Sequence, residues 1–367
     1  MIHRPHSVVP SSTTIRVVIA YKNFAANKGI SHIGLGVAAL NTMQSLRSKG
    51  IWVEVWPITS PVDLTTQLRT TQAQAFERGQ VPVSHVIISA PWIPTPAIQS
   101  LLMEFGQVHF TVVSHSNIGF LMADSNGIKL LREANQLQAG YHNFSVGGNS
   151  QKFCDAWFHM YGVRPIFLPN LYNVATISQV GERTPWSQGP LRIGIFGATR
   201  PLKNMVSAAA GAIEISRKLR TDVEVWTSTG REEGGGDTVS RAVGELINGL
   251  PTVKLVRSGW QSWAGFRKIV GTMHLLLQPS YTESFNMVTA DGIAEGVASV
   301  VSDAIDWVPG DWVAHADKVD DIAQTGIRLL HDRHAVNDGQ RALRTYVQHG
   351  VTHWEKFLLH DVGNHGL

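Results

Sequence analysis

The sequence predicts an α/β protein with two domains, each built on a parallel β-sheet with helices on both faces. The chain has 367 residues, which is too long for one ordinary hydrophobic core and suits two domains of typical size. Short apolar runs of strand length alternate with longer stretches of helical spacing, an order typical of parallel sheets. A stretch rich in proline and glycine near the middle interrupts this alternation, which then resumes.

The first half of the chain contains four apolar or β-branched runs of strand length. They predict strands at residues 14–21, 51–58, 85–91 and 107–114. Segments with helical spacing separate them at residues 37–50, 65–79 and 95–106. The first of these segments ends on Gly50, and glycine is the residue type that most often closes a helix.

Residues 169–190, PNLYNVATISQVGERTPWSQGP, contain three prolines and two glycines without a clear period, which predicts a connection between domains. Further strands are predicted after it, at residues 191–198, 221–228, 252–259 and 273–280. We therefore expect a Rossmann-like domain at 1–175, a linker at 176–190, a second Rossmann-like domain at 191–340 and an amphipathic helical tail at 341–367. The apolar residues that this tail offers for burial are Leu343, Tyr346, Val347, Trp354 and Leu358.

The composition narrows the classes of function. The net charge is +3, from 31 basic and 28 acidic residues, which is a weak indication of a polyanionic partner but compatible with a bound phosphate or diphosphate. Because no apolar run approaches the roughly 18 residues of a membrane span, and the N-terminus lacks a signal-peptide core, we expect a cytoplasmic protein without a transmembrane segment. Cys154 is the only cysteine, which excludes an intramolecular disulfide and a thiolate metal cluster.

Two cations follow the first predicted strand of the second half. Two facing α/β domains would place their strand ends on the walls of one cleft, where ligands bind. In LRIGIFGATRPLKN, residues 191–204, the strand runs through Gly197 into a loop with Arg200 and Lys203, followed by an alanine-rich helix. Cations near a helix N-terminus suit a diphosphate and the negative charge that grows on it as a leaving group. The alternative is that both cations only solvate an exposed loop.

An acidic residue follows the last predicted strand. In QPSYTESFNMVTADGIAEG, residues 278–296, the loop carries Glu283 and the helix carries Asp291 about two turns along. The amides of Phe285, Asn286 and Met287 are expected in the first helical turn, where they are free to donate hydrogen bonds. An acceptor carboxylate beside a row of donors suits a polyhydroxylated ligand. The alternative for Glu283 is a capping acid stabilised by the helix dipole.

These residues carry a resemblance to a known family. PSYTESFNMVTADGIAEGVASVVSD, at 279–303, resembles the signature of the retaining GT-B nucleotide-sugar glycosyltransferases known as glycosyl transferases group 1. GATRPLKN, at 197–204, is similar to that family's loop of glycine, arginine and lysine, and FLPNLYN, at 167–173, to the end of its first domain. The resemblance covers most of residues 14–335. It implies a GT-B fold with an acceptor-side first domain, a donor-side second domain and a tail helix that crosses back to the first domain.

The resemblance also implies an activity and site residues. The enzyme would transfer a sugar from a nucleoside diphosphate to an acceptor hydroxyl with retention of configuration. Lys203 and Arg200 would bind the donor diphosphate, Glu283 would face the donor sugar, and Asp291 would bind the nucleotide ribose. His115, at the end of a strand, would lie near the donor sugar, with a structural loop histidine as the alternative. Further donor-binding positions would be Gly34, Gly36, Gly197, Ser284, Phe285, Asn286 and Met287.

Two positions depart from the family pattern. The second acid is Asp291 rather than glutamate, one methylene shorter, so its ribose contact would be longer, mediated by water or suited to another nucleotide. The family's arginine stands five residues before the lysine, where this chain has Ala198, so Arg200 has no direct counterpart.

No cofactor is expected besides the nucleoside-diphosphate sugar as co-substrate. No Asp-x-Asp stands at a predicted strand end, and the cations can neutralise the diphosphate, so we expect no metal requirement. The acceptor stays open, with a carbohydrate or small molecule favoured and a nucleic acid carrying a hydroxylated base as the alternative. An alternative of another class is a catalytically weak nucleotide-sugar-binding protein, suggested by the altered acid at Asp291.

Overall fold

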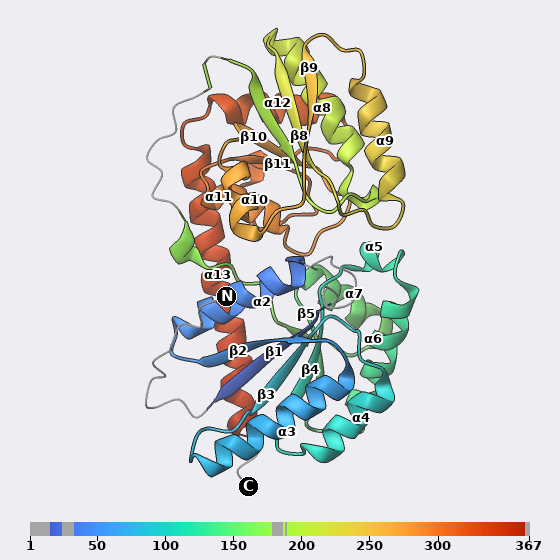
Figure 1. Cartoon of the computed structure of the whole chain (residues 1–367), viewed down its shortest axis with the longest axis vertical. Helices are drawn as coiled ribbons and strands as arrows, with labels where there is room; N and C mark the ends of the chain where they lie inside the picture. Colours follow the sequence, from blue (N-terminus) through green and yellow to red (C-terminus); the bar gives the residue numbers. More distant parts are fainter. Residues whose placement is uncertain (1–14, 24–32, 178–185, 188, 364–367) are drawn as a thin grey trace. The chain divides into compact units, whose positions relative to one another are not determined.

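The computed structural model describes residues 15–23, 33–177, 186–187 and 189–363 (Figure 1). The chain divides into two compact units, and neither is one continuous stretch of chain. Unit 1 comprises Met1–His115, Ser125–Leu171 and Gly350–Leu367, and unit 2 comprises Ser116–Asp124 and Tyr172–His349. The chain therefore passes from one unit to the other at four places.

Unit 1 contains a six-stranded sheet of order β2-β1-β3-β4-β5-β6, in which every neighbouring pair is parallel. Its strands are β1 (Arg16–Lys22), β2 (Trp52–Ile58), β3 (His85–Ser89), β4 (His109–Ser114), β5 (Phe144–Gly148) and β6 (Ile166–Phe167). β3, β4 and β5 are buried along their whole length, as expected for inner strands of a sheet covered on both faces. The four strands predicted in the first half are confirmed as β1 to β4.

The helices of unit 1 follow their strands in alternation. They are α2 (Ile33–Arg47), α3 (Pro61–Glu77), α4 (Thr95–Glu104), α6 (Ser125–Gln138) and α7 (Gln151–Tyr161). Local sequence sets the start of α3, where the hydroxyl of Ser60 accepts a hydrogen bond from the amide of Asp63 at 3.1 Å. Pro61 takes the first helical position, where its missing N–H costs nothing.

Unit 2 contains a five-stranded parallel sheet of order β11-β10-β7-β8-β9. Its strands are β7 (Leu191–Ile195), β8 (Val223–Ser228), β9 (Val253–Ser258), β10 (Leu275–Gln278) and β11 (Ser299–Val301). The strand order runs from β7 to β9 in one direction and then returns to the other side of β7 with β10 and β11. Ligands of open α/β sheets bind at such a reversal, just beyond the carboxyl ends of the strands. In unit 2 the reversal lies between β7 and β10.

The helices of unit 2 are α5 (Ile118–Leu121), α8 (Met205–Leu219), α9 (Gly236–Ile247), α10 (Trp263–Val270), α11 (Met287–Ala294) and α12 (Val319–His331). Short 3₁₀ turns are η1 (Val174–Thr176), η2 (Pro201–Lys203) and η3 (Gly310–Trp312). α8 and α12 approach closely at Gly211, where the absence of a side chain leaves room for Ile322. A Cβ on Gly211 would lie only 2.6 Å from Cγ2 of Ile322. This packing holds α8 in place directly after the loop that leaves β7.

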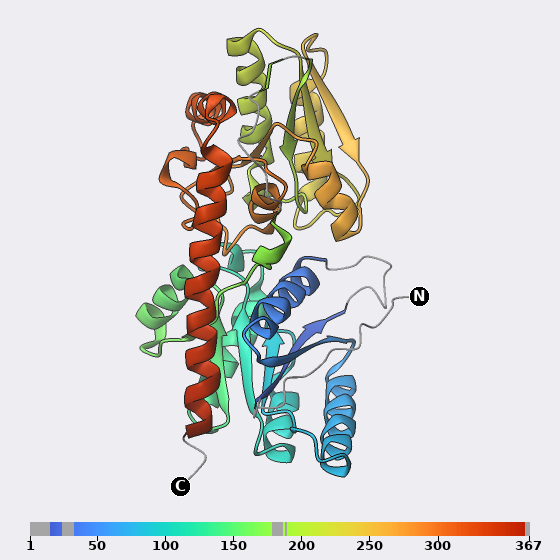
Figure 2. The same ribbon diagram turned by 90° about the vertical axis from the view of Figure 1, so that its left-hand side faces the viewer.

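α13 (Ala335–Gly363) is one continuous helix of 29 residues, seen along its length in Figure 2. Its residues up to His349 belong to unit 2, and those from Gly350 onward belong to unit 1. Within unit 1, the indole of Trp354 donates to the backbone oxygen of Pro169 across 2.9 Å. Four of the five apolar positions predicted for the tail are buried, namely Leu343, Val347, Trp354 and Leu358.

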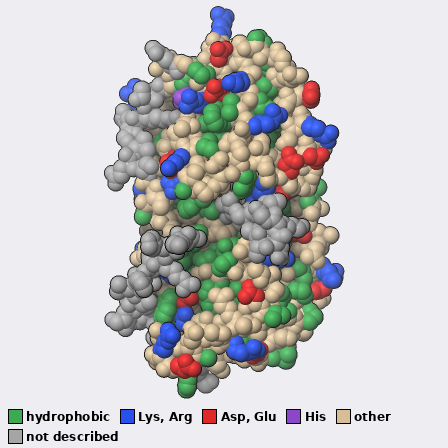
Figure 3. All heavy atoms as spheres, viewed as in Figure 1, with side chains coloured by type: hydrophobic (Ala, Val, Ile, Leu, Met, Phe, Trp, Pro, Cys, Tyr) green, Lys and Arg blue, Asp and Glu red, His purple; other side chains and the backbone are tan. Residues whose placement is uncertain are grey.

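The face of the molecule in Figure 3 carries lysine and arginine side chains interspersed with aspartate and glutamate. No extended field of one sign covers the coloured part of that face. This pattern agrees with the small net charge of +3. Among the described helices, none combines the length and the apolar character needed to cross a lipid bilayer.

Candidate functional site

Two loops of unit 2 meet at the reversal of its sheet. The β7 loop spans residues 196–204, and the β10 loop spans residues 279–286. The amide of Tyr281 donates to the carbonyl of Leu202 across 3.0 Å, which joins the two loops through their backbones. The side chain of Asn204 adds a second link by donating to the carbonyl of Pro279 at 2.9 Å. The two loops are thus tied to each other at the place where the sheet topology favours a ligand.

Gly197 and Asn204 shape the β7 loop, since both have left-handed backbones with φ of +120° and +53°. A side chain at Gly197 would be strained, and its Cβ would lie 3.6 Å from Cε of Lys203. The loop therefore needs glycine here for its left-handed backbone and not to make room for Lys203, because 3.6 Å is an ordinary van der Waals distance. From this loop, the ammonium group of Lys203 reaches the β10 loop.

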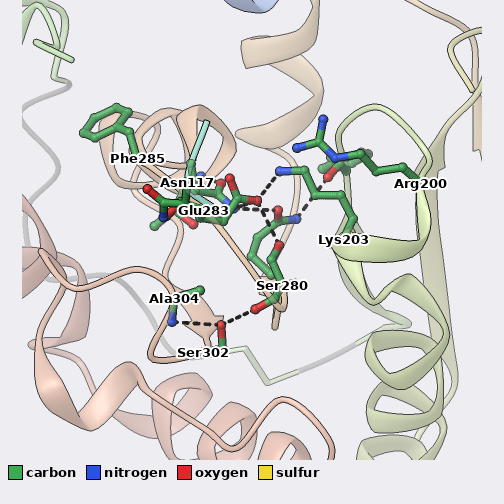
Figure 4. A network of polar contacts seen from close by, with 12 residues as sticks. Asn117, Arg200, Lys203, Ser280, Glu283, Phe285, Ser302 and Ala304 are labelled. Atoms are coloured by element: carbon green, nitrogen blue, oxygen red, sulfur yellow. Dashed lines mark hydrogen bonds and ion pairs between the residues drawn. The ribbon is translucent and has the colours of Figure 1, made fainter. Parts of the chain in front are cut away.

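Lys203 and Glu283 form a buried ion pair between the two loops (Figure 4). Their side chains are 10% and 8% exposed. Oε1 of Glu283 also accepts from the hydroxyl of Ser280 at 2.9 Å and from the side-chain amide of Asn286 at 3.3 Å. Within the described part of the chain, every hydrogen bond to this carboxylate reaches Oε1 and none reaches Oε2. Oε2 is therefore the acceptor that Glu283 can offer to a ligand.

The protonation states of this pair follow from burial and charge together. Burial by itself would raise the pKa of Glu283, but the positive charges of Lys203 and Arg200 outweigh it and hold that pKa below its ordinary value. Burial lowers the pKa of Lys203, against the attraction of Glu283. At neutral pH the carboxylate is ionised, so Glu283 acts as an acceptor and not as a proton donor.

Arg200 pairs with Glu233 instead, with 3.0 Å between Nη1 and Oε2. Arg231 holds the other oxygen of Glu233 at 2.5 Å. The loop that carries Arg231 is bound to the β7 loop, because the amide of Thr199 donates to the carbonyl of Arg231 at 3.0 Å. Together with the Lys203–Glu283 pair, these residues form a group of three cations, Lys203, Arg200 and Arg231, and two carboxylates, Glu233 and Glu283. The group therefore has a net charge of +1.

The residues after the buried carboxylate present different groups. α11 begins at Met287, two residues later than the sequence suggests, because Asn286 has a left-handed φ of +64° and caps the helix. Its Oδ1 accepts from the amide three residues further on at 3.0 Å. The ring of Phe285 is 2% exposed and packs in the core of unit 2. Ser284 and Met287 are partly buried.

Asp291 is the fifth residue of α11, just over one turn along the helix rather than two. Its carboxylate is buried, and Oδ1 accepts from the hydroxyl of Tyr172 at 2.8 Å and from the indole of Trp263 at 3.0 Å. Burial raises the pKa of Asp291 to about 7, although both hydrogen bonds and the nearby Arg267 act in the opposite direction. The acid that the resemblance assigns to a ribose is thus engaged by two aromatic side chains of its own unit.

A short segment that follows β4 in the chain also lies at this site. Ser116–Asp124 belongs to unit 2. The side-chain amide of Asn117 donates to the backbone oxygen of Glu283 at 2.5 Å. The guanidinium carbon of Arg200 lies 4.7 Å from the ring centroid of Phe120, within the range of a cation–π contact. The segment therefore touches both the β10 loop and the β7 loop.

His115 lies in unit 1, and both of its ring nitrogens have partners there. Nε2 lies 2.8 Å from the hydroxyl of Ser89, and Nδ1 lies 3.2 Å from the amide nitrogen of Asn149. Because an amide nitrogen only donates, Nδ1 accepts, and Nε2 carries the hydrogen that it donates to Ser89. Burial lowers the pKa of His115 to about 4, so the ring is neutral at neutral pH.

Gly34 and Gly36 lie in the first turn of α2, also in unit 1. A Cβ on Gly36 would lie 3.3 Å from the ring of Tyr21, so this glycine serves close packing. Gly34 is exposed and has open space around it. The loop before α2 at residues 24–32 lies outside the described residues.

The sequence does not single out four residues that the structure places beside Glu283, Glu233 or Asp291, namely Asn117, Arg231, Tyr172 and Trp263. Asn117 stands two residues after His115, so its place just beyond a strand is a signal that the sequence does contain. Arg231 begins the run REEGGGD, whose composition indicates only a loop. Tyr172 and Trp263 carry no polar pattern that distinguishes them from core residues.

The chain has the GT-B fold of two Rossmann-like units, as the sequence predicts. Sucrose-phosphate synthase from Thermosynechococcus elongatus is similar with a TM-score of 0.62 and 14% identity, covering 95% of this chain and 98% of that one. The UDP-forming α,α-trehalose-phosphate synthase from Burkholderia xenovorans, in complex with glucose-6-phosphate, gives 0.62 and 13%, with 95% and 100% covered. Anabaena HepE in complex with UDP gives 0.58 and 11%, with 94% and 98% covered. No protein-family model and no curated protein sequence matches the chain.

Proposed function

We propose that this chain, which shares the GT-B fold of sugar-phosphate synthases, is a retaining glycosyltransferase that uses a nucleoside-diphosphate sugar and needs no metal ion. The observation that carries the proposal is the buried Lys203–Glu283 pair at the reversal of the sheet of unit 2. It combines a cation suited to a diphosphate with a carboxylate oxygen suited to a sugar hydroxyl. Because one similar structure holds UDP and another is named UDP-forming, UDP-sugars are the first donors to test.

The proposed transfer needs stabilisation of the leaving group above all. The bond between the anomeric carbon and the diphosphate oxygen breaks, and its electron pair stays on the diphosphate. Lys203 would stabilise that growing charge, with Arg200 and Arg231 adding to the positive potential of the group. Preorganised charges of this kind act without reorganisation at the moment of reaction. Lys203 is therefore the residue on which turnover should depend most.

We infer direct attack by the acceptor, without a covalent enzyme intermediate. Glu283 is the acid nearest the proposed sugar position, but three donors hold its Oε1 and its pKa lies below the ordinary value. A carboxylate stabilised in this way is a weak nucleophile. The acceptor oxygen would instead form its bond to the anomeric carbon on the face that the diphosphate leaves, and its proton would pass to the departing phosphate.

The proposed metal independence rests on the donor set of the site. Mg²⁺ and Mn²⁺ prefer carboxylate, carbonyl and water oxygens. Both carboxylates of the group, Glu233 and Glu283, are instead held by cationic side chains. In the described ranges, no three His, Cys, Asp or Glu side chains are grouped so as to hold a metal ion. Cations of the protein would therefore neutralise the diphosphate.

We propose a carbohydrate or another small molecule as the acceptor. On the face shown in Figure 3, lysine and arginine are interspersed with aspartate and glutamate, and the net charge of the chain is only +3. Recognition of nucleic acid relies instead on a strongly basic surface. A hydroxylated base in nucleic acid stays the alternative acceptor. The two differ in salt dependence, because only binding to a polyanion weakens steeply as salt rises.

A second candidate function is binding of a nucleotide sugar without efficient transfer. The observation that favours it is the carboxylate of Asp291, which is buried and already accepts from Tyr172 and Trp263. A ribose hydroxyl would have to compete for this carboxylate. A protein of this kind would bind the donor but release nucleoside diphosphate from it very slowly.

One experiment tests both candidates. A thermal-shift screen with UDP, ADP, GDP and their sugar derivatives identifies the ligand, because a ligand at 100 times its Kd raises stability by about 2.7 kcal/mol. Release of nucleoside diphosphate from the stabilising sugar nucleotide then separates an enzyme from a binding protein. For an enzyme, the anomeric configuration of the product, read by NMR, tests retention. Absence of stabilisation by every nucleotide and sugar nucleotide would reject both functions.

A further inference from the structure

The segment Ser116–Asp124 is unusual in the course of the chain. It follows β4 of unit 1 and precedes α6 of unit 1, yet it belongs to unit 2. Its contacts reach the two loops that carry the Lys–Glu pair. Gly119 faces Thr282 of the β10 loop so closely that an added Cβ would lie 3.3 Å from the Cβ and Oγ1 of that threonine. The chain thus sends nine residues to the proposed donor site before it returns to unit 1.

Asn117 is a polar residue of this segment that contacts the site directly. Its side-chain amide donates to the backbone oxygen of Glu283. Because a carbonyl oxygen can only accept, this contact must come from Nδ2, and the orientation of the amide is fixed. Oδ1 therefore points away from that carbonyl. In Figure 4, Asn117 lies beside Glu283, and Lys203 and Arg200 follow on the other side.

Oδ1 of Asn117 has no hydrogen-bond partner among the described residues, although the residue is only 7% exposed. Buried polar atoms are ordinarily paired, so an unpaired one calls for a ligand or another explanation. Oε2 of Glu283 is a second acceptor without a partner in the described part of the chain. Asn117 and Glu283 are in contact in the folded chain, and each offers an acceptor oxygen. A ligand that satisfies them must donate hydrogen bonds.

This requirement selects the chemistry of the ligand. Phosphate oxygens at neutral pH mainly accept hydrogen bonds, so a diphosphate does not satisfy Asn117 and Glu283. A sugar ring presents several hydroxyl donors at fixed relative positions, so it offers the type of group that both oxygens need. The cations of the site lie with the β7 loop, where the diphosphate is proposed to bind. The acceptor oxygens accordingly suit the sugar half of the same donor.

We propose that Asn117 is a specificity-determining residue, whose Oδ1 accepts a hydrogen bond from one hydroxyl of the donor sugar. This inference rests on the proposed function and deepens it. Nδ2 at the same time donates to the backbone oxygen of Glu283. One side chain would thus position Glu283 and also recognise a hydroxyl of the sugar. An epimer that turns this hydroxyl away leaves Oδ1 buried and unpaired, and sites that hydrogen-bond a hydroxyl discriminate against such analogues.

The test is calorimetric titration of the full chain. UDP, ADP and GDP first identify the nucleotide, and its glucose, galactose and N-acetylglucosamine derivatives then give the preference among sugars. Asn117→Ala should lower the preference for the best sugar over the worst by about tenfold, as expected for one lost hydrogen bond. The Kd of the free nucleoside diphosphate should stay within about twofold, because the proposed contact is made only to the sugar.

Two further variants sharpen the test. Asn117→Gln retains the amide but moves its oxygen by one methylene, so it should also lose preference and guards against misfolding of the alanine variant. Met122→Ala is the matched control, since this side chain belongs to the same segment and is 78% exposed. It should leave the preference unchanged.

The possible failures are distinguishable. If the parent binds no sugar nucleotide, the proposed function itself fails, and this inference fails with it. If the parent distinguishes sugars and both folded Asn117 variants retain that preference, only the role of Asn117 is rejected. Equal weakening of nucleotide and sugar nucleotide would likewise reject it, because a purely structural role affects both ligands alike. A parent that binds all three sugar derivatives equally has no preference for Asn117 to set, which also overturns the inference.

Discussion

Tyr172, the residue at which the chain enters unit 2 for the second time, donates its hydroxyl hydrogen to Asp291 across 2.8 Å. The same oxygen of Asp291 accepts from Trp263. Arg267 holds the chain four residues further on, because its Nη2 donates to the carbonyl of Thr176 at 2.9 Å. The buried acid therefore anchors the start of this stretch of chain, besides any contact with a ligand.

This anchor should make stability depend on pH through Asp291. Its pKa is about 7 in the folded protein and about 3.8 when exposed, so the folded state holds the proton more tightly. The tighter binding of this proton stabilises the folded state fully below about pH 4. The stabilisation is lost as the pH rises from about 4 to about 7, at up to about 1.4 kcal/mol per pH unit. Asp291→Asn retains an oxygen for Tyr172 and Trp263 and removes the titration.

The measurement is urea denaturation of parent and variant between pH 4.5 and 8. The difference in unfolding free energy should shift in favour of Asp291→Asn as the pH rises, and it should level off above about pH 8. A difference that does not change with pH would show that Asp291 has an ordinary pKa. If Asp291 also binds ribose, the variant should bind nucleoside diphosphate about 1–3 kcal/mol more weakly in calorimetric titration.

Lys203→Met should lower turnover on the order of a hundredfold or more, because the charge of Lys203 is needed most when the diphosphate departs. It should also destabilise the fold by about 3–5 kcal/mol, since Glu283 is left buried without its cation. The double variant Lys203→Met with Glu283→Gln removes both charges and should recover much of the stability. It should not recover turnover, and normal turnover in either folded variant would remove Lys203 from the mechanism.

Glu283→Gln should separate the sugar from the nucleotide. The variant retains the shape of the side chain but removes the charge that the sugar hydroxyls would meet, so transfer should fall at least tenfold while the Kd of free nucleoside diphosphate stays nearly constant. Glu214→Gln is the matched control, because Glu214 also pairs with cations but lies on α8 beside Arg217 and Lys218. Parental rates for Glu283→Gln would indicate that this carboxylate has only a structural role, as the partner of Lys203.

Chelation should leave activity intact. Three cationic side chains, Lys203, Arg200 and Arg231, gather at the proposed diphosphate position and leave a net positive charge. Initial rates with excess EDTA should therefore equal those in untreated buffer. Loss of activity that Mn²⁺ or Mg²⁺ restores would mean that a metal ion, and not the protein, neutralises the diphosphate.

The fold is predictable from the sequence because its strongest signals are local. Strands such as β1 and β10 contain short unbroken apolar runs, and the alternation of strands and helices then predicts a parallel sheet. β6, of two residues, and β11, of three, are too short to show a period, and pairing with neighbouring strands defines them.

The candidate site is only partly predictable, because several of its contacts join distant stretches of chain. Lys203 and Glu283 each follow a strand, so the rule of strand ends finds both. That Asn117 reaches Glu283, 166 positions away, depends on a segment that leaves its own unit. The partners of Asp291 illustrate the same limit, since Tyr172 and Trp263 resemble core residues until the fold brings them to the carboxylate.

The division of α13 between the units has a consequence for synthesis on the ribosome. Unit 1 lacks the helical stretch from Gly350 onward until about 180 residues after Leu171 have been added, a delay of about 10–40 s at about 5–20 residues per second. During that interval, the core that Trp354 and Leu358 complete stays open. The nascent first half is therefore a natural client for chaperones, and a gene fragment that stops at Leu171 should yield an aggregating product rather than a folded domain.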